Sequence, residues 1–185
     1  MFVLIAAIVV AATFAVYMLL ELNDDEGRAK FGGIESFVPT HGVKMAPHVE
    51  FLDKHGNGLT LEKFRGRIVV LNLWATWCTP CVAEMPMLDR MQAQLEDHGV
   101  VVVALSLDNG GPKAVREFFE EHEIDELKIY VDPTMRAQGT LGAMGLPTTI
   151  LIDREGRERG RVEGAVEWDE PRAMKLVLSA DDPPR

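Results

Sequence analysis

Two long apolar runs dominate the pattern of hydrophobic and polar positions along the chain. Residues 68–74 and 100–107 are almost continuously apolar and rich in β-branched side chains, which is typical of strands buried on both faces. A helical pattern covers residues 82–95 between them, and a second helix with one apolar face begins at Pro112. This alternation of strand and helix predicts an α/β fold whose sheet contains parallel strands.

Shorter patterns predict the elements on either side of this centre. Residues 49–53 alternate as a strand does, and a Gly-containing turn then leads to Leu59, which indicates a β-hairpin. The further predicted elements are a strand at 127–131, a helix at 134–141, a hairpin that returns through 158–164 and a closing helix at 168–178. The closing helix is expected to bury Trp168, Met174 and Leu178.

The first twenty residues carry no charged side chain. As a helix they would span roughly 30 Å, the thickness of the hydrocarbon core of a bilayer, and Tyr17 suits its interface. A secretory signal peptide has a basic start and an apolar core of about 7–15 residues, whereas this stretch has no basic start and a longer apolar run. We therefore predict an uncleaved transmembrane anchor, although Ala11, Ala12 and Ala15 leave cleavage open.

Length and charge limit the organisation and the function of the rest of the chain. The 185 residues suit one folded domain. The predicted order is an anchor at 1–20, an extracytoplasmic linker at 21–46, the folded domain at 47–180 and a flexible tail at 181–185. The net charge of −10 argues against a nucleic-acid ligand, because phosphate binding needs a basic face. His41 and His48 have no neighbours at metal-ligand spacing, so no metal site is expected there.

Both cysteines of the chain lie at the junction between the first buried strand and the helix that follows it. Two cysteines cannot form a disulfide framework, so they form either one redox pair or half of a metal site. Cys78 would open the helix, where the first-turn N–H groups and the helix dipole stabilise a thiolate, and Pro80 is tolerated in that first turn. Cys81 lies one turn further in, so Cys78 is expected to attack a partner and Cys81 to resolve the mixed disulfide.

Glu84 follows Cys81 by three residues, which places it on nearly the same face of the predicted helix, one turn deeper. A buried carboxyl group there would have a raised pKa and could take the proton of Cys81 as that thiol resolves the mixed disulfide. The alternative is a solvated glutamate on the surface. Pro86 then interrupts the helix interior and is expected to kink it.

The segment from Val70 to Pro86 reads VLNLWATWCTPCVAEMP, and it resembles the active-site signature of the TlpA/ResA/CcmG group of membrane-tethered, thioredoxin-like thiol–disulfide oxidoreductases. The likeness covers about residues 47–178 and, through residues 112–127 and 145–149, is greatest to TlpA. It implies a thioredoxin-like α/β fold, with a central mixed β-sheet flanked by helices, an N-terminal β-hairpin and a central insertion, preceded by one transmembrane helix. It implies no cofactor and no metal.

The resemblance also assigns roles to residues that lie near the cysteines in such folds. Pro147, at the head of a predicted strand, would be a cis-proline that faces the cysteine pair. The backbone of Leu146 would then offer hydrogen bonds to an extended client peptide. Trp77, Pro80 and Thr148 are expected to contact the client beside them.

Asn72 is a departure from ordinary thioredoxins, which carry a buried aspartate beneath the cysteines. Asparagine cannot act as a proton acceptor. The resemblance therefore favours Glu84 as the acid–base group, with Cys78 and Cys81 as the redox-active disulfide.

The function that the resemblance implies is a reductase of disulfides in partner proteins. We expect the chain to cross the inner (cytoplasmic) membrane once, with its catalytic domain in the periplasm, and a membrane thiol carrier to supply its electrons. The favoured clients belong to the assembly of cytochrome oxidase copper centres, such as a copper chaperone or an oxidase subunit. The alternative is cytochrome c maturation, in which disulfides of apocytochrome c are reduced.

Two other functions fit the sequence less well. A copper-binding chaperone could hold Cu(I) with Cys78 and Cys81, but its usual pattern has a wider cysteine spacing and a downstream histidine. A peroxidase of the same fold needs a Thr or Ser in a Pro-rich loop shortly before its cysteine, whereas Trp77 separates Thr76 from Cys78. A haem attachment site is excluded, because Val82 stands where that motif needs histidine.

Overall fold

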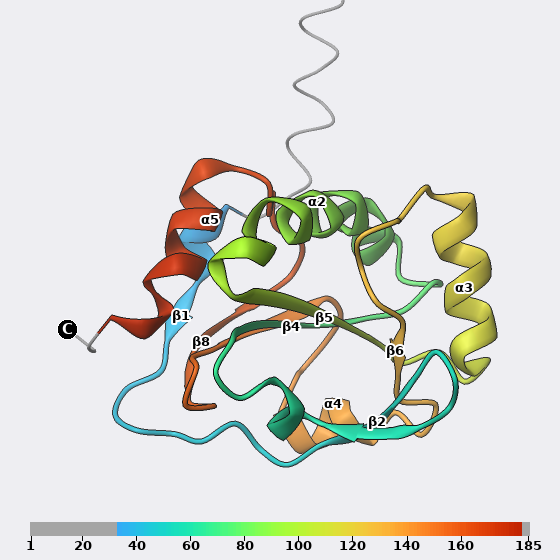
Figure 1. Ribbon diagram of the computed structural model, residues 1–185, viewed down its shortest axis with the longest axis horizontal. Helices are drawn as coiled ribbons and strands as arrows, with labels where there is room; N and C mark the ends of the chain where they lie inside the picture. Colours follow the sequence, from blue (N-terminus) through green and yellow to red (C-terminus); the bar gives the residue numbers. More distant parts are fainter. Residues whose placement is uncertain (1–32, 183–185) are drawn as a thin grey trace, which may run out of the picture. The chain divides into compact units, whose positions relative to one another are not determined.

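The first apolar run forms the central strand β4 (Ile68–Trp74), in which every residue is buried. β4 pairs in parallel with β5 (Val100–Ser106) and antiparallel with β7 (Thr148–Ile152). In the computed structural model, which describes residues 33–182, these three strands are the middle of an eight-stranded sheet (Figure 1). Helices cover both of its faces, which explains why neither apolar run alternates with polar residues.

The complete strand order is β1-β8-β7-β4-β5-β6-β2-β3. The outer strands are β1 (Val38–Pro39), β2 (Glu50–Asp53), β3 (Gly58–Thr60), β6 (Tyr130–Val131) and β8 (Glu158–Glu163). β4, β5 and β6 run parallel to one another, and the strands on both sides of them pair antiparallel. The parallel centre and the hairpin of β2 and β3 confirm the predicted α/β fold with a mixed sheet.

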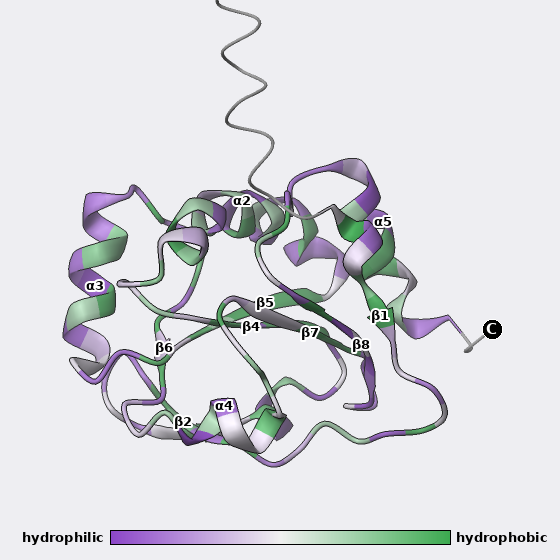
Figure 2. Cartoon of the chain, turned by 180° about the vertical axis from the view of Figure 1, so that it is seen from behind, coloured by the Kyte–Doolittle hydropathy of each residue, from purple (hydrophilic) through white to green (hydrophobic). Residues whose placement is uncertain are grey.

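Two layers of helices enclose the sheet (Figure 1). α2 (Thr79–Leu95) and α5 (Pro171–Leu178) lie on one face, whereas α4 (Arg136–Leu141) and the 3₁₀ helix η2 (Leu61–Phe64) lie on the other. α3 (Gly111–Glu121) lies at the β6 side of the molecule. Figure 2 shows hydrophobic residues concentrated in the central strands and hydrophilic residues on the outer sides of the helices. Each face of the sheet therefore carries its own apolar core.

The last residue of β4 also anchors α3. The ring of Trp74, which is fully buried, lies 5.0 Å from the ring centroid of Phe118 and 6.1 Å from that of Phe119. These two phenylalanines belong to the apolar face that the sequence predicts for this helix. The packing fixes α3 against β4, the strand that ends shortly before Cys78. The segment between β4 and Cys78 is called the cysteine loop below.

One predicted strand is shorter than expected. The pattern at 127–131 yields only the two-residue strand β6. The backbone N–H groups of Glu126 and Leu127 both donate to the Asp89 carboxylate on α2, at 2.9 Å, instead of to a neighbouring strand. The Asp89 side chain thus satisfies the backbone N–H of Leu127, the first residue of the predicted strand.

The prediction of the closing helix was wrong at its start. α5 begins at Pro171, because proline suits a first helical turn, and Trp168 lies in the turn before it. Trp168 is nevertheless buried, as predicted, whereas Leu178 is 40% exposed at the end of the helix and Met174 is only partly buried. α2, in contrast, continues through Pro86 without interruption, and the kink there stays a prediction.

The folded region extends beyond both predicted boundaries of the domain. Val38–Pro39, expected in the linker, pairs with β8, and a two-residue strand is too short to give a periodic pattern. At the other end the 3₁₀ helix η4 (Ser179–Asp181) reaches past residue 180. The predicted transmembrane anchor at 1–20 lies outside the described residues, and no helix within residues 33–182 is long and apolar enough to cross a membrane.

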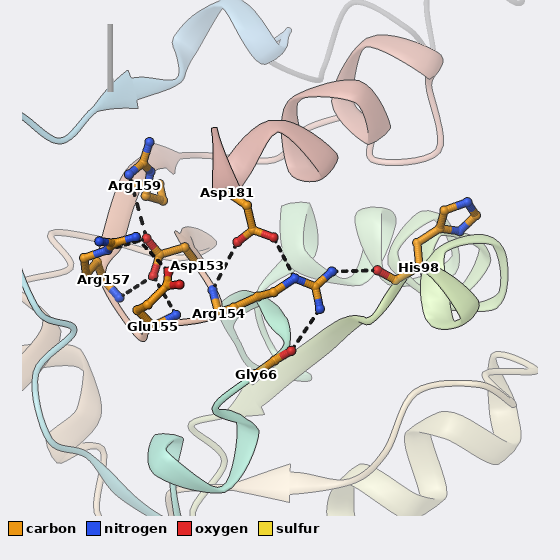
Figure 3. Close-up of polar contacts among 8 residues, drawn as sticks. All are labelled: Gly66, His98, Asp153, Arg154, Glu155, Arg157, Arg159 and Asp181. Atoms are coloured by element: carbon orange, nitrogen blue, oxygen red, sulfur yellow. Dashed lines mark hydrogen bonds and ion pairs between the residues drawn. The ribbon is translucent and has the colours of Figure 1, made fainter. Parts of the chain in front are cut away.

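Arg154, in the turn between β7 and β8, connects three distant segments (Figure 3). Its guanidinium donates from Nε to Asp181 Oδ2 at 2.6 Å, from Nη1 to Gly66 O at 2.9 Å and from Nη2 to His98 O at 3.0 Å. One side chain thus satisfies carbonyl groups before β4 and before β5 and holds the C-terminal η4 against them.

We expect Arg154→Ala to lower the free energy of unfolding by about 1 kcal/mol, because two carbonyls and a carboxylate lose a charged donor at a partly exposed site. Arg136→Ala is the matched control, since the exposed Arg136 guanidinium makes no hydrogen bond or ion pair within the described chain. Urea unfolding of both variants measures the difference. Equal midpoints for the two variants would contradict this role of Arg154.

Candidate active site

The two cysteines lie where β4 ends and α2 begins. Cys78 is the N-cap residue of α2, and its Sγ accepts the backbone N–H of Cys81 at 3.4 Å. The two residues form a disulfide. Cys78 is 6% exposed and Cys81 is fully buried, so the sulfur at the helix N-terminus is the one that a partner can reach. This agrees with the predicted division into an attacking and a resolving thiol.

A buried carboxylate fixes the loop that carries Cys78. Asp108, two residues after the end of β5, accepts the backbone N–H of Thr76 at 3.0 Å and the Thr76 hydroxyl at 2.7 Å. It also accepts the Ser106 hydroxyl at 2.8 Å. β4 and β5 are parallel neighbours, so their following residues meet at one edge of the sheet. Asp108 was missed from the sequence, where the only signal is an acidic residue directly after a buried strand.

The residues expected on the client side lie at the same edge. The Leu146–Pro147 peptide bond is cis, as predicted. Thr148 pairs with Leu73 across β7 and β4, so Pro147 lies level with Trp74, just before the cysteine loop. Antiparallel pairing of β7 therefore brings the start of that strand to the cysteines.

Exposed apolar side chains border these residues. Trp77 is 64% exposed and Pro80 is also exposed, while Leu146 is partly buried. Met144, in the loop before the cis-proline, is 89% exposed. Large apolar groups at this exposure are available to contact another molecule. The client-binding role of Trp77, Pro80 and Leu146 stays a prediction.

Thr148 has a different environment from the other predicted client contacts. It is fully buried, and its Oγ1 lies 2.7 Å from both Gly145 O and Glu163 Oε2. The hydroxyl therefore braces the loop before Pro147 from inside the fold. Its place among the residues that contact the client stays a prediction.

Glu84 is fully buried on α2, one turn beyond the equally buried Cys81, so it is no solvated surface residue. Its Oε1 accepts Asn72 Nδ2 at 2.7 Å. Its Oε2 accepts the Val166 N–H at 3.1 Å and Trp168 Nε1 at 3.0 Å. The carboxyl group is thus held by β4 and by the segment between β8 and α5 as well as by its own helix.

Burial raises the pKa of Glu84 to about 7, from an ordinary value of 4.5. The donors from Val166, Asn72 and Trp168 act in the opposite direction, because they stabilise the ionised form. A carboxyl group whose pKa lies near neutrality can both accept and release a proton under ordinary conditions. The structure therefore gives Glu84 the environment that the sequence predicts for an acid–base group.

The partners of Glu84 were largely missed from the sequence. Trp168 was predicted only as a core residue. Val166, and Thr149 that accepts a hydrogen bond from Asn72, carry no local signal for this site. They are more than sixty residues away from Glu84 along the chain. Only the folded sheet brings them together, so no spacing rule could have identified them.

No group of three or more His, Cys, Asp or Glu side chains in the described part of the chain is arranged to hold a metal ion. A cavity of about 650 Å³ lies between the hairpin of β2 and β3 and the helix α4. Its lining includes neither the cysteines nor Glu84. The chemistry that the site can carry is that of the two thiols and the carboxyl group.

The raised pKa of Glu84 predicts a pH-dependent stability. The folded protein binds the Glu84 proton more tightly than the unfolded chain, so this stabilisation is complete below about pH 4.5 and is lost as pH rises through about 7. We expect the loss to reach about 3 kcal/mol. Urea unfolding of the oxidised protein between pH 4 and pH 9 should therefore show a larger decline for wild type than for Glu84→Gln. Parallel pH dependences for the two proteins would contradict the buried, raised pKa.

Comparison with known proteins identifies the group to which this site belongs. The model of the AhpC/TSA family matches residues 43–159. The thiol-disulfide oxidoreductase ResA of Bacillus cereus is 31% identical over 152 residues, which cover 82% of this chain and 87% of that protein. ResA of Bacillus anthracis is 33% identical over 145 residues, which cover 78% and 83%.

Solved structures agree with the sequence relatives. A protein of Chlorobium tepidum described as a thiol:disulfide interchange protein DsbE has a TM-score of 0.66 and 29% identity, and the match covers 75% of this chain and 96% of that one. The thioredoxin-like fold and the likeness to the TlpA/ResA/CcmG group are thereby confirmed, while the preference for TlpA within the group stays a prediction. The chain therefore belongs to the AhpC/TSA family of thioredoxin-like proteins, and it is a thiol–disulfide oxidoreductase.

Proposed function

We propose that the chain is a dithiol reductant of disulfides in partner proteins. The observation that carries this proposal is the arrangement along α2: a cysteine that is 6% exposed at the helix N-terminus, a fully buried cysteine one turn in, and a buried carboxyl group one turn further. This order gives each group one step of a dithiol–disulfide exchange.

In the first step the Cys78 thiolate attacks one sulfur of a client disulfide. A bond forms between Cys78 Sγ and that sulfur, and the other client sulfur leaves as a thiolate that takes up a proton from water. The N-terminal turn of α2 favours this step because its N–H groups and the helix dipole stabilise the attacking thiolate.

In the second step Cys81 resolves the mixed disulfide. Glu84 takes the proton of the Cys81 thiol, and the resulting thiolate attacks Cys78 Sγ, so that the second client sulfur leaves as a thiolate. The client disulfide gains two electrons, and the Cys78–Cys81 pair loses two and becomes a disulfide. Glu84 then releases its proton, which a pKa near 7 permits.

The client would dock along the cis-proline. The exposed faces of Trp77 and Pro80 border Cys78, and the backbone beside Leu146 can hydrogen-bond an extended peptide next to β7. Backbone pairing of this kind accepts many sequences, which suits an enzyme that needs only a reachable disulfide.

The clients that we propose are cysteine pairs that must be reduced before copper or haem is inserted. Assembly of cytochrome oxidase copper centres is the first candidate, and reduction of apocytochrome c is the alternative. The uncharged residues 1–20 support a single-pass anchor in the inner membrane, with the catalytic domain in the periplasm. A membrane thiol carrier would return the electrons to the disulfide.

Trapping of clients tests this proposal. Without the resolving thiol, Cys81→Ser should accumulate clients on Cys78 as mixed disulfides in intact cells, whereas Cys78→Ser, the matched control, should trap none. Diagonal electrophoresis under non-reducing and then reducing conditions separates the trapped proteins. Equal yields from both variants would contradict an attacking role for Cys78.

The direction of electron flow has a separate test. We expect the Cys78–Cys81 pair to be a reductant, with a potential well below the value of about −120 mV that is typical of a strong disulfide oxidant. Equilibration of the protein with glutathione buffers measures this potential. A value near that of the oxidant would reverse the proposed direction.

A further inference from the structure

The two oxygens of the Glu84 carboxyl group have partners of different kinds. Oε2 accepts from the Val166 backbone N–H and from the Trp168 indole N–H, and neither group can accept a hydrogen bond. A proton on Oε2 would therefore face two other protons. When Glu84 is protonated, the proton belongs on Oε1.

Oε1 meets the side-chain amide of Asn72. The Asn72 Nδ2 donates to Oε1 at 2.7 Å and to Thr149 Oγ1 at 2.9 Å. This orientation suits an ionised Glu84, because both N–H groups of the amide have acceptors. It does not suit a protonated Oε1, which would point its proton at a donor.

The other end of the same amide has no partner. Asn72 Oδ1 is buried, and no hydrogen-bond donor reaches it within the described residues. Rotation of the amide by a half turn would bring Oδ1 to the present position of Nδ2. There it could accept the proton of Glu84 Oε1 and the hydroxyl proton of Thr149, both at hydrogen-bond distance. Within the described residues no donor faces the side where Oδ1 now lies, so the present orientation gains no hydrogen bond there.

We propose that the Asn72 amide turns over when Glu84 takes up a proton, which makes Asn72 a positioning residue for proton transfer from Cys81. The inference deepens the proposed function and rests on it, because Glu84 must act as the acid–base group. The amide donates to the carboxylate and accepts from the carboxylic acid. Glu84 therefore stays in one place in both states, one turn from Cys81.

The surroundings of Glu84 leave this amide as the group that can respond. β4 contributes Asn72, β7 contributes Thr149, and the segment before α5 contributes Val166 and Trp168, none of which ionises near neutral pH. On α2 itself, Cys81 is the titratable neighbour once the disulfide is reduced. An aspartate at position 72 would instead place a second acid beside the first, and the two protonations would be coupled.

Nuclear magnetic resonance of the oxidised full-length chain in detergent micelles tests the inference. The chemical shift of the Glu84 carboxyl carbon reports its ionisation, and the side-chain N–H signals of Asn72 report the orientation of the amide. The Asn72 signals are assigned by their absence in Asn72→Leu, or through the backbone if that variant does not fold. We expect the nuclear Overhauser effect from the Asn72 N–H to the Thr149 β-proton to be strong at pH 9. As the pH falls to 5, this signal should disappear, and the midpoint of its loss should equal the midpoint of the Glu84 titration.

Glu84→Gln is the matched control, because its own amide can donate to Asn72 at every pH. In that variant we expect the Asn72 signals to stay in the low-pH state from pH 5 to pH 9. A Thr149 contact that persists while Glu84 titrates would overturn the inference, and so would a Glu84 signal that does not titrate in this range. The Thr149 contact could disappear together with the Glu84 titration in a protein that reduces no disulfide. That result would support the amide rotation and contradict the proposed function, so the two failures are distinguishable.

Discussion

A carboxyl group without access to water is the constraint on which the active site depends. Glu84 is fully buried, yet each of its oxygens has a hydrogen-bond donor. Burial alone would keep the group protonated, and the three donors alone would keep it ionised. Their opposition leaves its pKa near 7. That balance requires β4, α2 and the segment before α5 to meet at one point, so the proton chemistry depends on the whole fold.

The topology of the sheet explains why the rest of the site gathers nearby. β4 and β5 are parallel, and both end at the edge where the cysteine loop and Asp108 lie. β7 is antiparallel to β4, so its beginning, with the cis-proline, reaches the same edge. The attacking thiol, the carboxylate that holds its loop and the surface for the client thus come from three strands. Each of these groups lies at or close to the end of its strand, so no long loop is needed to bring it to the site.

The parts of this site that could be predicted are those encoded over short distances. The spacing of Cys78, Cys81 and Glu84 determines their order along a helix, and the resemblance to thioredoxin-like oxidoreductases implied that Pro147, at the head of a strand, is a cis-proline. Contacts across the sheet have no such signal. The hydrogen bond from Trp168 to Glu84 joins residues 84 positions apart, and it exists only because the strands pair in this order.

The fold shows the same distinction. The long apolar runs predicted β4 and β5 almost to the residue, because complete burial leaves a clear pattern. β1 and β6 have two residues each, and their pairing depends on what lies beside them. The Asp89 side chain binds the backbone of Glu126 and Leu127 just before β6, a contact that hydrophobicity cannot reveal.

The central claim is that Glu84 accepts the proton of Cys81 during resolution, and the rate of that single step tests it most directly. Reduced protein is mixed with an excess of a peptide disulfide, so that the mixed disulfide on Cys78 forms quickly, and its decay is followed by acid quenching and mass spectrometry. We predict that the decay in wild type accelerates through a midpoint near pH 7, and that Glu84→Gln is about 100-fold slower at pH 7, without that midpoint. Decay of the variant at the wild-type rate and with the wild-type pH dependence would contradict the account.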